Sequence, residues 1–269
     1  MADFILAEAE FTRQAAILST LSVMVDVNAA RTAPVLVDGR ALPFVPNGGQ
    51  NTMAAAAVVL LAAHFEEYVR QQVEEYGRSL VGRYRNLDDD SRIKFIDAYW
   101  RSGLNRLQRI RPKYSIQWSG HALPLLRGLA TFPAEDDEGA FVAAWLCDHD
   151  NNMRFDTVLD LCGRVGVKRL AERMARSNAL KGALGITRQA DASEALRGKL
   201  GEFYDLRNTM VHSIAQYAGI GPTIFESWKN FLLIFSSAFK DAMENALEEF
   251  EASISPIAAP QADAAAQAI

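Results

Sequence analysis

The residues best suited to chemistry lie in one short stretch near the end of the chain. Arg207, Asn208 and His212 follow one another there as an Arg-Asn-x3-His string. An Arg side chain offers a forked cation that matches phosphate oxygens, and an imidazole can carry a proton near neutral pH. With an amide to position the substrate, the three groups suit work on a phosphodiester. The spacing alone is not specific, because an Arg and a His fall five residues apart by chance in many helices.

The positions of these residues around the helix sharpen the interpretation. Residues 193–217 carry a helical apolar period, and a turn of ~100° per residue places Arg207 inside the apolar arc. His212 falls ~140° away from Arg207, on a polar strip that it shares with Asn208 and Asp205. Asn208 and His212 are i,i+4 neighbours and can interact directly. The string is therefore not an Arg–His pair on one helix face.

A guanidinium on an apolar face is costly unless it is paired and hydrogen-bonded. The helix predicted over residues 51–81 has one apolar arc, with Glu66 at its edge and Glu67 on the opposite side. We expect Glu66 to pair with Arg207. That pair would be either a purely structural tie between two helices or the support of a functional Arg.

Composition indicates an ordinary globular protein. The chain has 269 residues, of which 49% are hydrophobic and 23% charged, enough for one sizeable core. No apolar run reaches the ~18 residues that span a bilayer, and the N-terminus lacks the charged and apolar regions of a secretion signal. Cys147 and Cys162 fit a reducing compartment. We expect a cytoplasmic protein without a membrane partner.

Charge is distributed unevenly along the chain. The net charge is −5, yet residues 78–113 contain ten Lys or Arg and four Asp or Glu. This segment is either a footprint for a polyanion or a solvated helix face. If it binds RNA, the candidate contacts are Arg101, Arg106, Arg109, Arg111 and Lys113. Tyr99 and Trp100 lie among these residues and either stack on bases or pack in the core.

The hydrophobic pattern predicts an all-α fold. Helices are expected over residues 7–27, 51–81, 88–111, 138–147, 153–163, 168–176, 193–217 and 223–251. Asp38-Gly39 between short apolar runs predicts a small β-hairpin near residues 35–43. Pro124, Pro133 and several Gly residues predict an irregular stretch over 113–139. Thr223 and Glu226 have the spacing of a capping box at the start of the last helix, and the tail from Ser255 is expected to be disordered.

Cys147-Asp148-His149-Asp150 combines side chains that bind metals. Four consecutive residues cannot enclose one ion as spaced ligands do, so a turn at a helix end is the better interpretation. We expect neither a metal nor a cofactor.

Two elements resemble the HEPN superfamily of all-α domains, and most closely a subgroup of larger bacterial HEPN-like nucleases. One is Ala62-Ala63-His64-Phe65-Glu66-Glu67-Tyr68-Val69, and the other is the Arg207-to-His212 string. Asn151-Asn152-Met153-Arg154-Phe155-Asp156 resembles the middle of such proteins less specifically. The resemblance implies one HEPN-type helical bundle over residues 1–252. Its core would lie at 50–76 and 138–252, with an insertion at 77–137 and a disordered tail at 253–269.

The resemblance also implies an activity. Active members of the superfamily are metal-independent endoribonucleases that work as homodimers, with the two Arg…His strings meeting in a composite cleft. His212 would act as general acid or base, Arg207 would stabilise phosphorane charge and Asn208 would position the cleft. Glu66 and Asp205 would support them. A cleft made by two subunits need not draw its Arg and His from one helix face.

The same resemblance suggests a role in stress response or defence against phage, with an antitoxin or another defence protein as a partner. One branch carries a Tyr two residues after the His, which a partner nucleotidyltransferase modifies. Ile214 occupies that position here, which argues against that pairing. The alternative is a non-catalytic HEPN scaffold that binds RNA or a protein.

Overall fold

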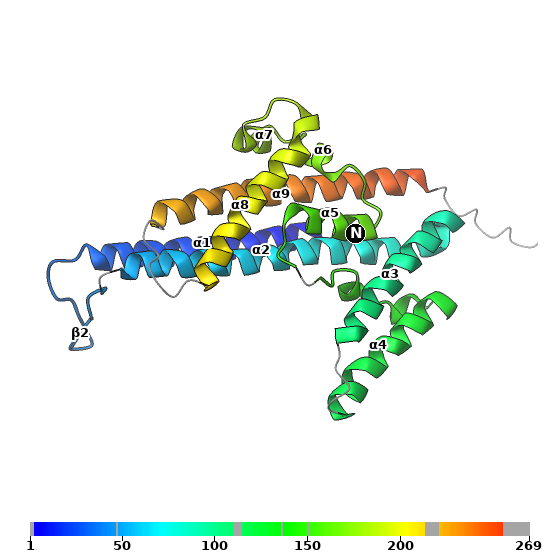
Figure 1. Cartoon of the computed structure of the whole chain (residues 1–269), viewed down its shortest axis with the longest axis horizontal. Helices are drawn as coiled ribbons and strands as arrows, with labels where there is room; N and C mark the ends of the chain where they lie inside the picture. The colour runs from blue at the N-terminus through cyan, green and yellow to red at the C-terminus, as the bar shows by residue number, and fades with distance from the viewer. Residues whose placement is uncertain are drawn as a thin grey trace, which may run out of the picture.

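Three long helices lie side by side and form the body of the molecule (Figure 1). They are α1 (Phe4–Ala29), α2 (Gly49–Val81) and α9 (Pro222–Ser253). This computed structural model describes residues 3–46, 48–109, 115–135, 137–149, 151–212 and 221–254. The all-α prediction is confirmed, because the only strands in these ranges form one short hairpin.

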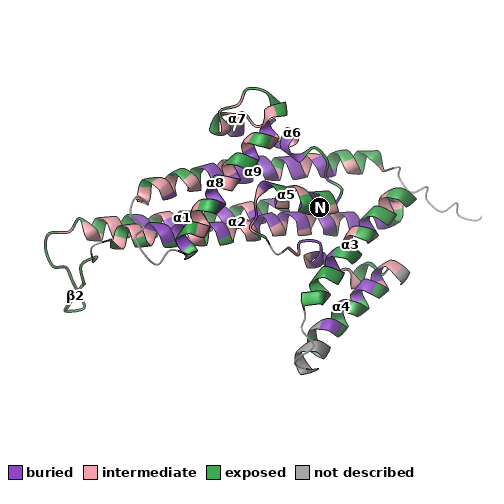
Figure 2. Ribbon diagram, viewed as in Figure 1, coloured by how far each residue is buried: buried purple, intermediate pink, exposed green. Residues whose placement is uncertain are grey.

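The apolar arc predicted for α2 forms the centre of the core. Val58, Leu61, Phe65, Val69 and Val73 are fully buried. Because α2 packs against both α1 and α9, the purple of buried residues runs along much of its length in Figure 2. Among the described helices, α2 alone is long and apolar enough to cross a membrane, and half of its most apolar stretch is buried inside the protein.

The predicted hairpin is confirmed. β1 (Leu36–Val37) pairs with β2 (Arg40–Ala41) in antiparallel register. Asp38 and Gly39 have φ of 50° and 75°, as a two-residue hairpin turn requires. The hairpin projects beyond one end of the long helices (Figure 1).

Residues 113–139 were expected to be irregular, and this prediction is wrong for most of them. A helical hairpin of α3 (Asp89–Arg109) and α4 (Ser115–Glu135) projects from the bundle (Figure 1). The residues of α4 that face the core recur at helical spacing and are buried: Ala122, Leu125, Leu129 and Phe132. Burial of this face outweighs the local cost of Pro124 and Pro133 inside the helix.

The helix predicted over 138–147 is also wrong. Two 3₁₀ turns, η2 (Glu138–Ala140) and η3 (Ala143–Trp145), occupy this stretch instead. Another 3₁₀ turn, η1 (Tyr84–Asn86), lies earlier in the chain, directly after α2. The Asp137 side chain accepts from the Gly139 N–H at the start of η2, and the chain is extended at Phe141. Local side-chain bonding of this kind competes with helix formation.

Short helices connect this region to the motif-bearing helix. They are α5 (Phe155–Arg164), α6 (Leu170–Met174) and α7 (Asn178–Leu184), followed by the 3₁₀ turn η4 (Gln189–Asp191) and α8 (Ala192–His212). The sequence pattern did not predict α7, which begins at a Ser177 cap and ends at Gly185 with φ of 67°. α8 crosses the long helices obliquely and packs on α2 and α5 (Figure 1).

The start of α9 differs from its prediction. Its N-cap residue is Gly221, which has no side chain to cap the helix. Glu226 does not close a capping box, because it accepts from Ser19 at 2.5 Å and from Lys229 at 2.5 Å. Residues 213–217 of the predicted helix over 193–217, including Ile214, lie outside the described residues, as does the predicted tail beyond residue 254.

Candidate functional site

The Arg207-to-His212 string occupies the last turns of α8, whose inner face packs against the core. Phe203, Tyr204 and Met210 on that face are buried. Arg207, which the helical wheel placed inside the apolar arc, is half-buried. Its Nη1 donates to Asn208 Oδ1 at 3.1 Å, whereas its buried Nε has no hydrogen-bond partner. The guanidinium is therefore held at one end and retains unused donor capacity.

Asn208 is held from two sides. Besides the bond from Arg207, its Oδ1 accepts from Asn152 Nδ2 at 3.2 Å. Asn152 lies in the loop before α5, where its own carbonyl accepts from Thr157 Oγ1 at 3.0 Å. The side chain of Asn208 is thus fixed in orientation by a loop that is distant in the sequence.

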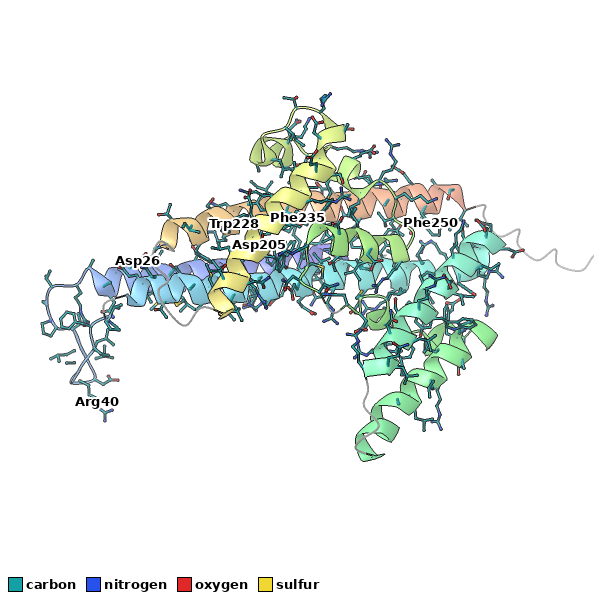
Figure 3. The ribbon with its side chains drawn as sticks, in the orientation of Figure 1. Asp26, Arg40, Asp205, Trp228, Phe235 and Phe250 are labelled. Atoms are coloured by element: carbon teal, nitrogen blue, oxygen red, sulfur yellow. The ribbon has the colours of Figure 1, made fainter. Side chains whose placement is uncertain are left out.

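Asp205 is bonded to the same loop. Arg154 Nη2 donates to Asp205 Oδ1 at 2.5 Å, and the two side chains remain 41% and 71% exposed. Figure 3 shows Asp205 on α8 where this helix crosses the body of the molecule. Asp205 therefore joins α8 to the segment before α5.

The expected ion pair between Glu66 and Arg207 is absent from the structure, so this prediction is wrong. No ion pair within 4.0 Å joins these two described side chains. Both side chains instead lie near the buried hydroxyl of Tyr204 and influence its pKa. Burial is the main cause that raises the pKa of Tyr204 well above its usual value; the nearby Glu66 carboxylate raises it further, and Arg207 lowers it. The Tyr204 hydroxyl thus lies near both charged side chains, although its oxygen forms no hydrogen bond of good geometry.

His212 ends α8, and its side chain lies outside the described part of the structure. The structure thus brings Arg207, Asn208, Asn152 and Glu66 into one neighbourhood, whereas the position of the imidazole stays a prediction.

The candidate RNA contacts on α3 are engaged in ion pairs. Arg101 pairs with Asp97 at 2.9 Å. Arg106 pairs with Asp148 at 3.5 Å, and Arg109 pairs with the same carboxylate. Arg111 and Lys113 lie outside the described residues. The basic segment is therefore largely matched by carboxylates, some of them brought from other parts of the chain.

The aromatic residues of this segment differ in their surroundings. Tyr99 is fully buried and Trp100 is 46% exposed, with its Nε1 donating to the Leu129 carbonyl at 2.8 Å. Tyr99 packs in the core, while Trp100 is partly exposed.

The comparison with protein-family models matches residues 38–245 to the RiboL-PSP-HEPN model. The chain belongs to the RiboL-PSP-HEPN family. The match runs from the β-hairpin to α9 and includes the α3–α4 hairpin, so this hairpin lies within the RiboL-PSP-HEPN region. No curated protein and no solved structure matches the chain. Membership of this family indicates a nuclease or RNA-related function in broad terms.

The RiboL-PSP-HEPN domain also has an open cleft beside Glu66, with a volume of about 400 Å³. It is lined by Ala63, Glu66, Glu67, Arg70, Arg106, Cys147, Asp148 and His149. The turn at 147–149 was interpreted from the sequence as a plain helix end. The structure places its side chains opposite α2 in this cleft, a proximity for which the sequence contains no local signal.

The two cysteines have a structural role. Both are buried, and burial raises the pKa of each thiol well above its usual value. They are therefore poor nucleophiles. Among the described residues, no group of three or more His, Cys, Asp or Glu side chains is placed to hold a metal ion.

Proposed function

We propose that this protein is a metal-independent endoribonuclease that cleaves RNA by attack of the ribose 2′-hydroxyl. The observation that carries the proposal is the arrangement at Asn208, whose Oδ1 is held by Asn152 and by Arg207. This arrangement fixes an Arg with spare donors beside the final turn that bears His212, in a chain of the HEPN type.

In the proposed reaction, His212 accepts the proton of the 2′-hydroxyl as this oxygen attacks phosphorus. The bond from phosphorus to the 5′-oxygen breaks, and that oxygen takes up a proton from an imidazolium. Arg207 donates hydrogen bonds to the non-bridging oxygens, where charge accumulates in the phosphorane. The products are a 2′,3′-cyclic phosphate and a 5′-hydroxyl, and the atoms balance without a co-reactant.

The proposal includes a homodimer with a composite site. Arg207 is half-buried on α8, and the wheel places His212 on a different face of that helix. Two copies of α8 meeting about a twofold axis would bring the Arg of one subunit to the His of its partner. We further propose that the enzyme acts in the cytoplasm in stress response or phage defence, restrained by an antitoxin or another defence protein.

The test is incubation of RNA with the full chain in excess EDTA, comparing wild type with His212→Ala and Arg207→Ala. We expect cleavage that survives chelation, leaves a 2′,3′-cyclic phosphate and is lost in the His212 variant. Arg188→Gln is the matched control, because Arg188 is an exposed Arg that pairs with Asp191, outside both the string and the basic segment. Retained RNA binding without cleavage by the wild type would instead support the non-catalytic scaffold.

A further inference from the structure

The cleft beside Glu66 has two walls from different parts of the fold. Glu66, Glu67 and Arg70 of α2 form one wall. Arg106 of α3 and the turn with Asp148 and His149 form the other. The volume of about 400 Å³ falls within the range of ~300–1,000 Å³ typical of small-ligand sites.

The two walls differ in charge. On the α3 wall, Asp148 pairs with both Arg106 and Arg109, and Arg106 also lines the cleft. On the α2 wall, two carboxylates, Glu66 and Glu67, line the cleft beside one cation, Arg70. Arg70 pairs with Glu67 at 3.5 Å. The cleft therefore offers hydrogen-bond donors on one side and carboxylate acceptors on the other.

The turn that carries His149 is held rigidly. Arg164 Nη1 donates to the carbonyls of Leu146 and Asp148 at 2.8 and 2.7 Å, and Cys147 Sγ donates to the Arg70 carbonyl at 3.4 Å. The His149 ring is fixed by a 2.7 Å bond between its Nδ1 and the Asn151 carbonyl. A carbonyl only accepts, so Nδ1 carries the hydrogen. The flat imidazole is thus pre-positioned in the cleft.

We propose that this cleft binds one base of the RNA next to the cleaved phosphate and prefers guanine. Guanine presents two acceptors, O6 and N7, which match the fork of an Arg such as Arg106. Its N1–H and exocyclic N–H are parallel donors, which match the two oxygens of a carboxylate such as Glu67. The His149 ring offers a face on which an unstacked base can lie. No other standard base has two acceptors on one edge and two parallel donors on the adjacent edge.

The inference rests on the proposed function, because it takes RNA as the ligand. The cleft lies near the Arg207-to-His212 string, which supports the inference. Glu66 lines the cleft, and both Glu66 and Arg207 lie near the Tyr204 hydroxyl and shift its pKa. The loop after His149 leads directly to Asn152, which bonds to Asn208. A base in the cleft would therefore belong to the same RNA segment as a phosphate at Arg207.

The test is fluorescence anisotropy with short 2′-O-methyl RNAs, which cannot be cleaved by 2′-hydroxyl attack. Each has a uridine background with one central G, A, C or U. We expect the wild-type full chain to bind the G-containing RNA about tenfold more tightly than the A-containing one. Arg106→Gln and Glu67→Gln should each remove most of this preference. Arg188→Gln, at an exposed Arg outside the cleft, should keep it.

The outcomes separate this inference from the nuclease itself. Equal affinity for the four RNAs, or a preference that both cleft variants keep, overturns the base site even if RNA is cleaved. A guanine preference without any cleavage supports the base site and counts against the nuclease. Binding of free guanosine monophosphate without a preference among the RNAs would overturn RNA as the source of the base. The melting temperatures of the variants show whether each one folds. If Arg106→Gln does not fold, Glu67→Gln still tests the cleft, because Glu67 is half exposed on α2.

Discussion

Asn152 Nδ2 donates to Asn208 Oδ1 at 3.2 Å, so the loop before α5 is bonded directly to the Arg-Asn-x3-His string of α8. Since Arg207 donates to the same oxygen, the orientation of the guanidinium depends on a residue 55 positions earlier in the chain. The site is thus held by tertiary contacts as well as by helix geometry.

Replacing Asn152 should lower activity more than stability. Asn152→Ala removes one of the two hydrogen bonds that orient Asn208, a loss worth about 1 kcal/mol, and should reduce kcat/KM for RNA about three- to tenfold. Asn245→Ala is the control, since Asn245 bonds only within α9. Steady-state cleavage and thermal unfolding of both variants provide the measurement. An unchanged kcat/KM in Asn152→Ala would show that the hydrogen bond from Asn152 to Asn208 does not contribute to cleavage.

Mixing two inactive variants tests the composite site. In a heterodimer of Arg207→Ala and His212→Ala, the intact Arg of one subunit can act with the intact His of the other. Random mixing in a twofold dimer should then restore about a quarter of wild-type cleavage. Each variant alone, measured at the same total concentration, is the control. If the mixture stays inactive although subunits exchange, Arg and His of the same subunit must act together.

Two glycines of α4 should respond in opposite ways to alanine. A Cβ at Gly128 would lie 2.5 Å from the Trp145 ring and 3.3 Å from the Ala140 carbonyl, so Gly128→Ala should destabilise the protein by about 1–3 kcal/mol through overpacking. Among the described residues, no atom lies within 4 Å of a Cβ at Gly120. Gly120→Ala should therefore stabilise by up to about 1 kcal/mol, the difference in helix propensity. Denaturant unfolding measures both, and a stabilised Gly128→Ala would contradict the close packing of α4 on Trp145.

Alkaline pH should destabilise the fold through buried tyrosines. Burial raises the pKa of Tyr99 to about 12, while the Val142 N–H that donates to its oxygen lowers it slightly. The raised pKa means that stability from the neutral phenol is fully present below pH 10, the usual tyrosine value, and is lost as pH rises towards 12. Tyr99→Phe should lose less stability than wild type between pH 9 and pH 11, as thermal midpoints would show. Parallel pH curves would mean that Tyr99 does not contribute to the transition.

The sequence pattern predicted the main helices well because their apolar periods agree with the final packing. α2 is the best case, since its predicted arc is buried almost without exception. α4 was missed because Pro124, Pro133 and glycines are local signals against a helix. The contacts of Leu129 and Phe132 with the rest of the core override those signals, and such contacts are not visible in a linear pattern.

The candidate site was predictable only in part, for the same reason. Arg207 and Asn208 are adjacent in the string, and the wheel placed the Arg at the core. The role of Asn152 could not be predicted, because its bond to Asn208 joins segments that are far apart in sequence. The Glu66–Arg207 pair was expected from the opposite charges and from the position of each residue at an apolar helix face, and no signal in the sequence indicated that the buried Tyr204 hydroxyl would lie near both.

The cleft has one wall on α2, at the centre of the core, and the other on the projecting α3–α4 hairpin and the turn beside it. The backbone of the first wall is fixed by the buried face of α2, whereas Arg106 lies on a helix that projects from the bundle. Under the proposed base site, replacing the hairpin should therefore change the base preference while the Arg-Asn-x3-His string on α8 stays unaltered.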